Sequence, residues 1–250
     1  MYTLKKSLGQ HFLKDERICK QIVSSLDMLK FDQLLEVGPG GGAITKYLLK
    51  IPDISFKAVE LDDEKINYLE KTYPDIKGKI IAASILEVGK PFQGPFTLIG
   101  NFPYNISSQI LFRVLEWKED VQAAVGMFQK EVAQRIAAPP GNKDYGILSV
   151  LVQAWFNVEY LFDVDEECFN PPPKVKSGVI RLINEGNPWK ITEEKKFFNL
   201  VKTSFGQRRK QLRNPTKHLF PPEVLQDTIF SKRAENLSVE DYVSLLKKMK

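Results

Sequence analysis

The chain has 250 residues, of which 43% are hydrophobic and 27% charged, and its net charge is +5. This length and apolar content suit an α/β domain with a real core, alone or with a small appendage. No apolar run is long enough to span a membrane, and the basic start lacks the apolar stretch of a signal peptide. Two cysteines argue against a disulfide framework or a cysteine metal site, so we expect a cytoplasmic protein.

Positive charge is concentrated in the last quarter of the chain. Residues 189–250 hold 14 Lys and Arg against 7 Asp and Glu, whereas the rest of the chain holds 22 against 24. Such asymmetry favours a separate basic surface for the phosphates of a nucleic acid. The alternative is a helical bundle whose lysines are simply solvated.

Helix and strand patterns alternate along the first part of the chain. A helix is predicted at 15–26, strands at 33–37, 55–60, 79–83, 96–100 and 122–128, and helices at 43–49, 63–73 and after the last of these strands through residue 138. This alternation predicts a parallel sheet covered on both faces. Segments 149–160 and 177–183 are predicted to close the sheet as an antiparallel pair.

Asn187-Pro188 marks a boundary, beyond which the pattern is helical. Helices are predicted at 193–204, 207–213, near 223 and at 239–248. We therefore predict an α/β catalytic domain at 1–186 and a small helical domain at 189–250.

A glycine-rich loop at residues 36–42 follows the first strand of the predicted sheet. Glycines allow a tight turn and the close approach of a ligand, and the next helix begins with free N–H groups. Glu60 ends the following strand, where a carboxylate can hold both ribose hydroxyls of a cofactor. The loop also fits the dinucleotide fingerprint Gly-x-Gly-x-x-Gly/Ala. Glu36 before the first glycine favours the form that binds S-adenosylmethionine.

The tetrad Asn101-Phe102-Pro103-Tyr104 directly follows the fourth strand of the predicted sheet. Ligands of open parallel sheets bind beyond the carboxyl ends of the strands, so the tetrad would stand beside the cofactor. The Asn101 oxygen and the Pro103 carbonyl can accept hydrogens from an exocyclic amine, and Tyr104 can stack on a base. Two acceptors favour a pyramidal, more nucleophilic nitrogen, placed for direct methyl transfer. The alternative is an Asn-Pro turn whose aromatic side chains pack into the core.

These motifs resemble the ribosomal RNA adenine N6,N6-dimethyltransferase family, and within it the small-subunit (16S) dimethyladenosine transferases. The resemblance covers nearly the whole chain and extends to Lys5–Asp15, Val59–Asp62, Phe169–Val179 and Phe205–Asn214. It implies a Rossmann-like class I S-adenosylmethionine-dependent methyltransferase sheet with a small C-terminal helical domain. The implied activity is dimethylation of N6 of two adjacent adenosines in the 3′-terminal hairpin loop of small-subunit rRNA. The implied setting is a pre-30S particle, with the enzyme a monomer that needs no metal and no membrane.

The resemblance also implies roles for single residues. The cofactor S-adenosylmethionine is expected to contact Gln10, His11, Leu13, Glu36, Gly38, Gly40, Glu60, Leu61, Ser84, Ile85 and Asn101. The target adenine is expected to contact Asn101, Pro103, Tyr104 and Phe169, held between two aromatic side chains as a flipped base is. RNA phosphates are expected to contact Lys5, Lys6, Arg208, Arg209, Lys210 and Arg213. Arg209 and Arg213 would share a helix face, although this cluster is also compatible with plain solvated charge.

Three positions depart from the family pattern. His11 stands where many relatives have Asn, and Phe102 is bulkier than the usual Leu or Ile, which we interpret as a packing change. Ser84 replaces an aspartate expected at the adenine amine of the cofactor. A hydroxyl can accept that hydrogen bond without the charge, so we expect cofactor affinity to be the property most affected.

Three other functions stay open at this point. The large-subunit relative that confers macrolide resistance shares the catalytic core, but the opening motif and Phe205–Asn214 argue against it. A ribosome-assembly factor with dispensable catalysis is favoured by Ser84. An NAD-dependent dehydrogenase would explain the glycines, but neither the tetrad nor the basic tail.

Overall fold

The computed structural model describes residues 11–250, and internal contacts divide the chain into two compact units. The first comprises the chain up to Ala133 together with Glu159–Asn184, and the second comprises Gln134–Val158 and Glu185–Lys250. Gln134–Val158 therefore packs with the C-terminal segment, although the predicted boundary would assign it to the first domain. The functional division into a catalytic domain at 1–186 and an RNA-binding domain at 189–250 stays a prediction.

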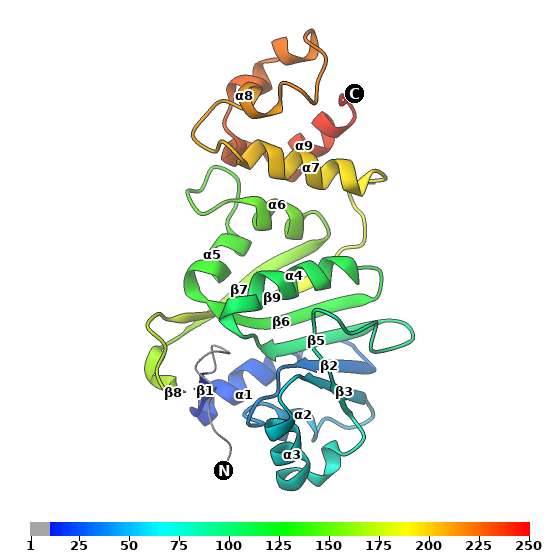
Figure 1. Ribbon diagram of the computed structural model, residues 1–250, viewed down its shortest axis with the longest axis vertical. Helices are drawn as coiled ribbons and strands as arrows, with labels where there is room; N and C mark the ends of the chain where they lie inside the picture. Colours follow the sequence, from blue (N-terminus) through cyan, green and yellow to red (C-terminus); the bar gives the residue numbers. More distant parts are fainter. Residues whose placement is uncertain (1–10) are drawn as a thin grey trace. The chain divides into compact units, whose positions relative to one another are not determined.

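The main sheet has the strand order β4-β3-β2-β5-β6-β9-β7 (Figure 1). Its strands are β2 (Gln33–Val37), β3 (Ser55–Glu60), β4 (Ile80–Ala82), β5 (Phe96–Asn101), β6 (Val121–Gln129), β7 (Phe156–Val164) and β9 (Ser177–Asn184). Strands β2 to β6 pair in parallel, and β9 pairs antiparallel with β6. This confirms the predicted parallel sheet with an antiparallel edge. A separate two-stranded sheet pairs β1 (Phe12–Leu13) with β8 (Phe169–Asn170).

The chain reverses its direction of travel across the sheet at β2. From β2 it moves outward to β3 and β4, and it then returns to the other side of β2 to form β5. Glu36 consequently lies opposite Ala58 of β3 on one side and Ile99 of β5 on the other. At such a switch point the loops after the two flanking strands leave a crevice at the carboxyl edge of the sheet, which is where ligands of open α/β sheets bind.

Helices pack apolar side chains against this sheet. The helices of this part of the chain are α1 (Glu16–Ser24), α2 (Thr45–Leu48), α3 (Asp63–Thr72), α4 (Ser107–Glu116) and α5 (Lys130–Ala137). Ile22 of α1 and Leu48 of α2 join Leu34, Phe56 and Ile99 of the central strands in one buried cluster.

Helix α4 is an addition to the predicted elements. Its buried residues Ile110, Leu111 and Val114 have the three- and four-residue spacing of a helix face that packs on a core. The helix begins directly after the tetrad and the 3₁₀ turn Tyr104–Ile106, so it carries the tetrad at its N-terminal end.

Residues 149–153, predicted as part of a strand, belong instead to α6 (Ile147–Gln153). The Ser149 hydroxyl accepts a hydrogen bond from the Gly146 N–H (2.8 Å) and donates one to the Arg135 carbonyl (2.5 Å), which anchors the first turn. A short continuous apolar run is compatible with either a buried helix or a buried strand, and the prediction chose the wrong one.

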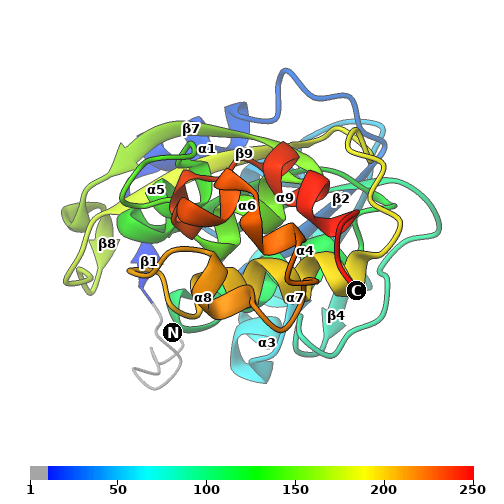
Figure 2. The same ribbon diagram turned by 90° about the horizontal axis from the view of Figure 1, so that it is seen from above.

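The C-terminal segment is helical, as predicted. Its helices are α7 (Glu194–Phe205), α8 (Arg213–Thr216) and α9 (Val239–Leu246), with short 3₁₀ turns between α8 and α9. Helices α7 and α9 lie side by side in both ribbon views (Figures 1 and 2). The rings of Phe205 and Tyr242 stack between them, with centroids 6.3 Å apart.

The prediction of a helix at 207–213 is wrong, because turns occupy this segment up to the start of α8. The Leu212 N–H donates to the carbonyl of Lys232 (2.8 Å), so the backbone here pairs with a distant segment rather than with itself. Arg209 consequently lies in a turn and Arg213 in the first turn of α8. The two arginines do not share a helix face.

Phe102 fills the space left by glycines in the sheet. Its side chain is 2% exposed and meets Phe128 edge-on, with ring centroids 5.1 Å apart. Gly100 of β5 pairs with Gly126 of β6 beside it. A Cβ atom at Gly126 would lie 2.6 Å from the Phe128 ring and would also overlap the Phe102 ring. The bulky residue at 102 therefore depends on the absence of a side chain at 126.

This packing predicts that Gly126→Ala destabilises the protein by about 1–3 kcal/mol, the usual cost of overpacking a core. The measurement is the denaturant midpoint, with Gly89→Ala as the matched control, because a Cβ at exposed Gly89 meets no atom within 4 Å. Equal stability of the two variants would contradict this account of the packing.

Candidate active site

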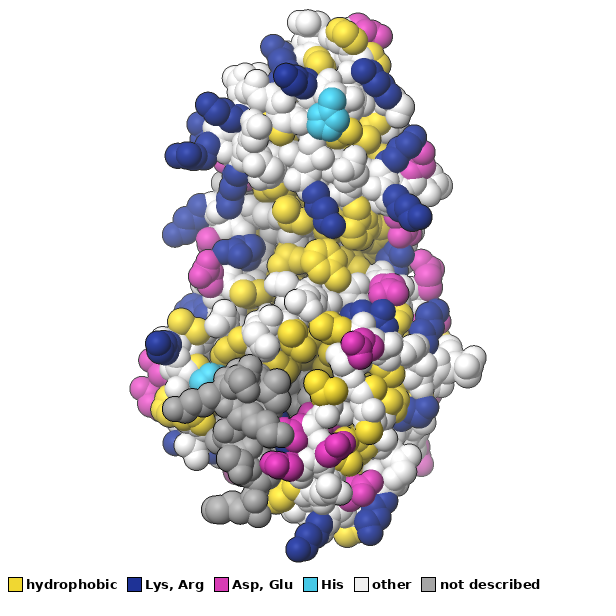
Figure 3. All heavy atoms as spheres, in the orientation of Figure 1, with side chains coloured by type: hydrophobic (Ala, Val, Ile, Leu, Met, Phe, Trp, Pro, Cys, Tyr) yellow, Lys and Arg dark blue, Asp and Glu magenta, His cyan; other side chains and the backbone are white. Residues whose placement is uncertain are grey.

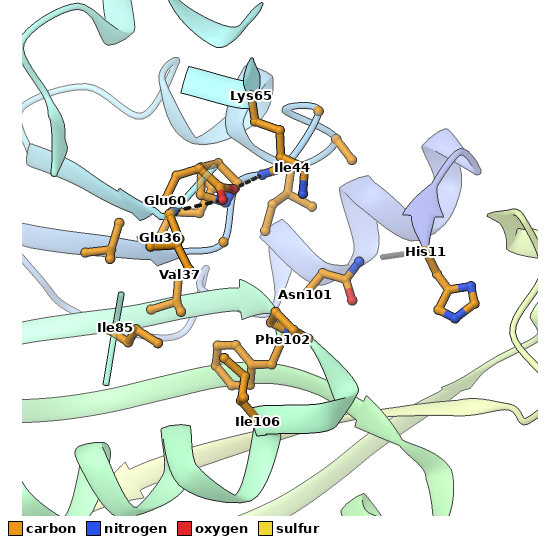
Figure 4. A pocket seen from close by; sticks show the side chains of 18 of the residues that line it. His11, Glu36, Val37, Ile44, Glu60, Lys65, Ile85, Asn101, Phe102 and Ile106 are labelled. Carbon is orange, nitrogen blue, oxygen red and sulfur yellow. Dashed lines mark hydrogen bonds between the residues drawn. The ribbon is translucent and has the colours of Figure 1, made fainter. Parts of the chain in front are cut away.

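A cavity of about 250 Å³ opens at the carboxyl edge of the sheet, beyond β2, β3, β4 and β5. It contains most of the residues predicted to bind the cofactor or the base: His11, Leu13, Glu36, Gly38, Gly40, Glu60, Leu61, Ser84, Ile85, Asn101, Pro103 and Tyr104. Figure 4 shows Glu36 and Glu60 on one side of the cavity, with Asn101 and then His11 toward the other. The switch point thus brings together segments that are more than 90 residues apart in the sequence.

A hydrogen bond from Gly40 to Glu60 holds the glycine loop against the end of β3. The Glu60 carboxylate accepts from the Gly40 N–H (3.0 Å), the Leu61 N–H (2.9 Å) and the Asp62 N–H (3.1 Å). Gly38 and Gly40 have φ values of +68° and +56°, which L side chains rarely adopt. Oε1 accepts two of these bonds and Oε2 accepts one, which leaves a lone pair on Oε2 for a further donor such as a ribose hydroxyl.

Glu36 is a buried carboxyl group at the inner end of the cavity. Its Oε1 accepts from the Thr45 hydroxyl (2.9 Å), and its Oε2 has no hydrogen-bond partner among the described residues. Burial, with a smaller contribution from the nearby Glu60 charge, raises the pKa of Glu36 to about 8. An orphaned acceptor at this position fits a cationic group on a ligand, because a buried carboxylate needs a partner. The residues present therefore fit the amino-acid end of S-adenosylmethionine.

The tetrad forms the opposite wall. The Asn101 side chain, at the end of β5, makes no hydrogen bond within the described part of the chain, so its amide oxygen is available to a ligand. The Pro103 carbonyl accepts from the Ile106 N–H (3.1 Å) and keeps one lone pair. The Tyr104 ring lines the cavity, with the His11 ring stacked at a centroid distance of 5.8 Å. Phe102 supports the tetrad from the core side.

Ser84 lies at the end of the cavity that β4 approaches. Its Oγ accepts from the Leu86 N–H (3.2 Å), which commits one of the two lone pairs to the local turn. Leu61 and Ile85 line the same region, and Leu61 is 61% exposed. A hydroxyl at position 84 therefore offers a ligand one neutral acceptor.

Among the described residues, neither Phe169 nor the predicted RNA-binding residues Arg208, Arg209, Lys210 and Arg213 line this cavity. Phe169 is fully buried in β8, paired with Leu13 of β1 inside the core cluster. Its predicted contact with the target base therefore requires a different side-chain position and stays a prediction. Gln10, Lys5 and Lys6 lie outside the described residues.

The basic residues belong to the second unit. Arg209, Lys210 and Arg213 are exposed. Arg208 is half-buried, and it donates to the Lys143 carbonyl and lies 3.9 Å from Glu235. Lys and Arg side chains are spread over the surface of this unit in Figure 3.

Sequence reasoning missed several lining residues. They include Phe12, Ile44, Lys65, Phe102 and Ile106. Lys65 is 7% exposed in the first turn of α3, and Figure 4 shows its side chain directed toward the cavity. Its position three residues after Asp62, at the start of the helix that follows β3, is the signal that could have identified it.

No group of three or more His, Cys, Asp or Glu side chains within residues 11–250 is arranged to hold a metal ion. Over the same residues, no helix is long and apolar enough to cross a membrane.

Comparisons with known proteins agree with this geometry. A family model described as ribosomal RNA adenine dimethylase matches residues 1–250. The ribosomal RNA small subunit methyltransferase A of Parabacteroides distasonis is 51% identical over 247 residues, covering 96% of this chain and 92% of that protein. A dimethyladenosine transferase from Plasmodium falciparum has a similar crystal structure, with a TM-score of 0.82, 25% identity and coverage of 96% of this chain and 99% of that one.

The 23S rRNA methyltransferase ErmE shares the fold. Its TM-score is 0.74 at 22% identity, and the match covers 95% of this chain and 99% of that one. The fold is thus that of the class I methyltransferases, as predicted. Because the family model spans the full length and a relative is 51% identical over 96% of the chain, this chain belongs to the ribosomal RNA adenine dimethylases, enzymes that methylate RNA with S-adenosylmethionine.

Proposed function

We propose that this enzyme dimethylates N6 of two adjacent adenosines in the 3′-terminal hairpin loop of small-subunit rRNA, acting as a cytoplasmic monomer on a pre-30S particle. The observation that carries this proposal is the placement of Asn101 and Tyr104 on the same cavity as Glu36 and Glu60. The choice of subunit is supported by the 51% identity to a protein named for the small subunit, against 22% to one named for 23S rRNA.

The cofactor would lie along the β2 and β3 side of the cavity. Glu60 would hold the ribose by accepting a hydroxyl hydrogen bond at Oε2, and Ser84 would accept one from the adenine amine. Glu36 would face the ammonium of the methionine end, near His11 and Leu13, while Gly38 and Gly40 allow close approach. When bound, S-adenosylmethionine supplies an electrophilic methyl group.

The tetrad would hold the target amine. In the first transfer, the Asn101 oxygen and the Pro103 carbonyl would each accept one N6 hydrogen, which draws the nitrogen lone pair out of conjugation with the purine ring. In the second transfer, one of them would accept the single hydrogen that remains on the methylated nitrogen. Tyr104 would stack on the base, a contact worth about 1–3 kcal/mol. Rate acceleration would come from this positioning and from acceptors suited to the developing positive charge. No side chain need take the proton before transfer.

Arg209, Lys210 and Arg213 would contact RNA phosphates. Their exposure supports this role, whereas the intramolecular contacts of Arg208 leave it less of its charge for RNA. Such contacts position an RNA without reading its sequence.

The test of the proposal is methyl transfer from labelled S-adenosylmethionine to unmethylated small and large ribosomal subunits, offered separately. Dimethyladenosine mapped to the small-subunit 3′ hairpin is the expected product. Label in the large subunit would assign the enzyme to the other branch of the family. Absence of label in both, with cofactor binding intact, would favour an assembly factor.

Asn101→Ala is expected to lower the rate of transfer at least a hundredfold and to leave cofactor affinity nearly unchanged. A hydrogen-bond acceptor that acts on the transition state affects mainly the rate, and removing one such group typically lowers kcat by about 10²–10³. Single-turnover transfer and calorimetric binding of S-adenosylmethionine measure the two properties. Asn236→Ala, at an exposed site of the second unit, is the matched control. Near-normal transfer by Asn101→Ala would remove this residue from the mechanism.

Cofactor binding at pH 7 is expected to release close to one proton. With its pKa near 8, Glu36 is mostly protonated in the free enzyme at pH 7, and an adjacent ammonium favours the carboxylate. The number of protons released on binding should fall toward zero above the pKa of Glu36, because the free enzyme has already lost the proton there. Calorimetry in buffers of different ionisation enthalpy measures it.

Glu36→Gln is the control for this measurement, since it cannot titrate. Because the pKa of Glu36 is raised in the folded state, the free energy of unfolding of the wild type should fall relative to that of Glu36→Gln as pH rises from about 4.5 through 8. Over this range the unfolded state gives up the proton before the folded state does. Equal proton release by wild type and variant would assign the effect to another group.

Arg209→Glu is expected to weaken binding to unmethylated small subunits and to make the salt dependence of binding shallower, because fewer counterions are released. Filter binding at several salt concentrations provides both values. Lys50→Glu, an equal charge change on the exposed end of α2, is the control. If both variants behave alike, net charge rather than a specific surface is responsible.

A further inference from the structure

The hydroxyl of Tyr104 has a partner that the predicted site does not include. Its Oη lies 2.5 Å from the Oγ of Ser177, and the two share a hydrogen bond in which either atom can donate. The residues are 73 positions apart, on the 3₁₀ turn after β5 and on the first residue of β9. The bond therefore joins the tetrad to a strand that contributes nothing else to the cavity lining.

Ser177 is a rigid anchor. It is fully buried, and its backbone is opposite Gln129 in the antiparallel β6–β9 ladder. The pairing continues beyond this end of the ladder, where the N–H of Lys130, just after β6, donates to the carbonyl of Lys176, just before β9 (2.9 Å). A short side chain on a paired strand has little freedom, so its hydroxyl defines a fixed point for the Tyr104 ring.

The Tyr104 ring needs a fixed contact of this kind to keep one orientation. A tyrosine side chain turns about two bonds, and a stacked base requires one ring plane. The His11 ring packs against Tyr104 at an interplanar angle of 28°, and its Nδ1 is 2.8 Å from the Pro171 carbonyl oxygen. His11 limits the ring on one face, and within residues 11–250 the bond to Ser177 is the hydrogen bond that holds the hydroxyl end of the ring.

We propose that Ser177 is a positioning residue for methyl transfer, which holds the Tyr104 ring in the plane on which the target adenine stacks. The inference rests on the proposed role of Tyr104 toward the base. Ser177 would not touch the substrate, and its removal should reduce the turnover rate without changing cofactor affinity.

A double-mutant cycle with Ser177→Ala and Tyr104→Phe tests the proposal. Tyr104→Phe keeps the stacking ring and removes the hydroxyl, so both single variants break the same bond. Each should lower kcat on small subunits about tenfold, equivalent to ~1.4 kcal/mol, with an unchanged Kd for S-adenosylmethionine. The double variant should be no slower than either single variant, because residues that act through one contact are not additive.

Losses that multiply in the double variant would overturn the proposal, as would a normal kcat for Ser177→Ala. The second result, with a lowered Tm, would show a purely structural hydrogen bond. Ser204→Ala is the matched control, since Ser204 is also buried and its hydroxyl donates to the Leu200 carbonyl (2.7 Å) in the second unit. It should lower the Tm and leave kcat unchanged.

A second measurement does not depend on the substrate. In protein with ¹³C-labelled tyrosine rings, Tyr104→Phe identifies the resonance of Tyr104. Ser177→Ala should shift and broaden that resonance in the free enzyme while the other tyrosines stay in place, and an unchanged Tyr104 signal would refute the anchoring. If wild-type enzyme methylates no ribosomal subunit, the proposed function fails, but this spectrum still decides whether Ser177 holds the ring.

Discussion

The parallel pairing of β2 with β3 on one side and β5 on the other is the constraint on which the site depends. Each strand end contributes one part: the glycine loop after β2, Glu60 at the end of β3, Asn101 at the end of β5. A one-residue slip in any of these ladders would turn the side chain to the opposite face of the sheet. The buried side chains of the central strands hold the register. Neighbours such as Leu34 and Leu35 point to opposite faces and are both fully buried, so a slip would exchange the side chains that pack on the two faces.

Within this frame the two acidic residues differ in environment. Glu60 accepts three backbone N–H bonds, and the one from Gly40 ties the glycine loop to the end of β3. Glu36 receives a single hydroxyl bond and is fully buried. The site thus has one acidic side chain that organises the loop and one whose charge state depends on what lies next to it. In the proposed function, Glu36 would be neutral without a ligand and would provide a counter-charge when a cationic group binds.

The elements around the cofactor could be predicted closely from the sequence. Strands β2 and β3 have the predicted bounds, because short apolar runs there end at glycine or at charged residues. Pattern reading failed where distant contacts decide the structure. The segment around Leu212 pairs with Lys232 rather than forming a helix, and the apolar run at 149–153 has no period that separates helix from strand.

The candidate site was predictable for a similar reason. Residues directly after strands were identified, because strand ends in a parallel sheet share an edge. Ser177 and Lys65 were not, because the contact of Ser177 with Tyr104 follows from how β9 joins β6, and Lys65 is recognisable only once α3 is placed. Phe169 is buried in the core, so the base contact that its motif predicts stays a prediction.

Phe102 and the paired glycines have a consequence for how such enzymes diverge. Because the Phe102 ring occupies the volume that a side chain at position 126 would need, the residue types at the two positions constrain each other. A side chain at position 126 needs room from both Phe102 and Phe128, because either ring would overlap its Cβ atom. A lineage that enlarges residue 126 before residues 102 and 128 change passes through a less stable intermediate, so a family alignment should show covariation among the three positions.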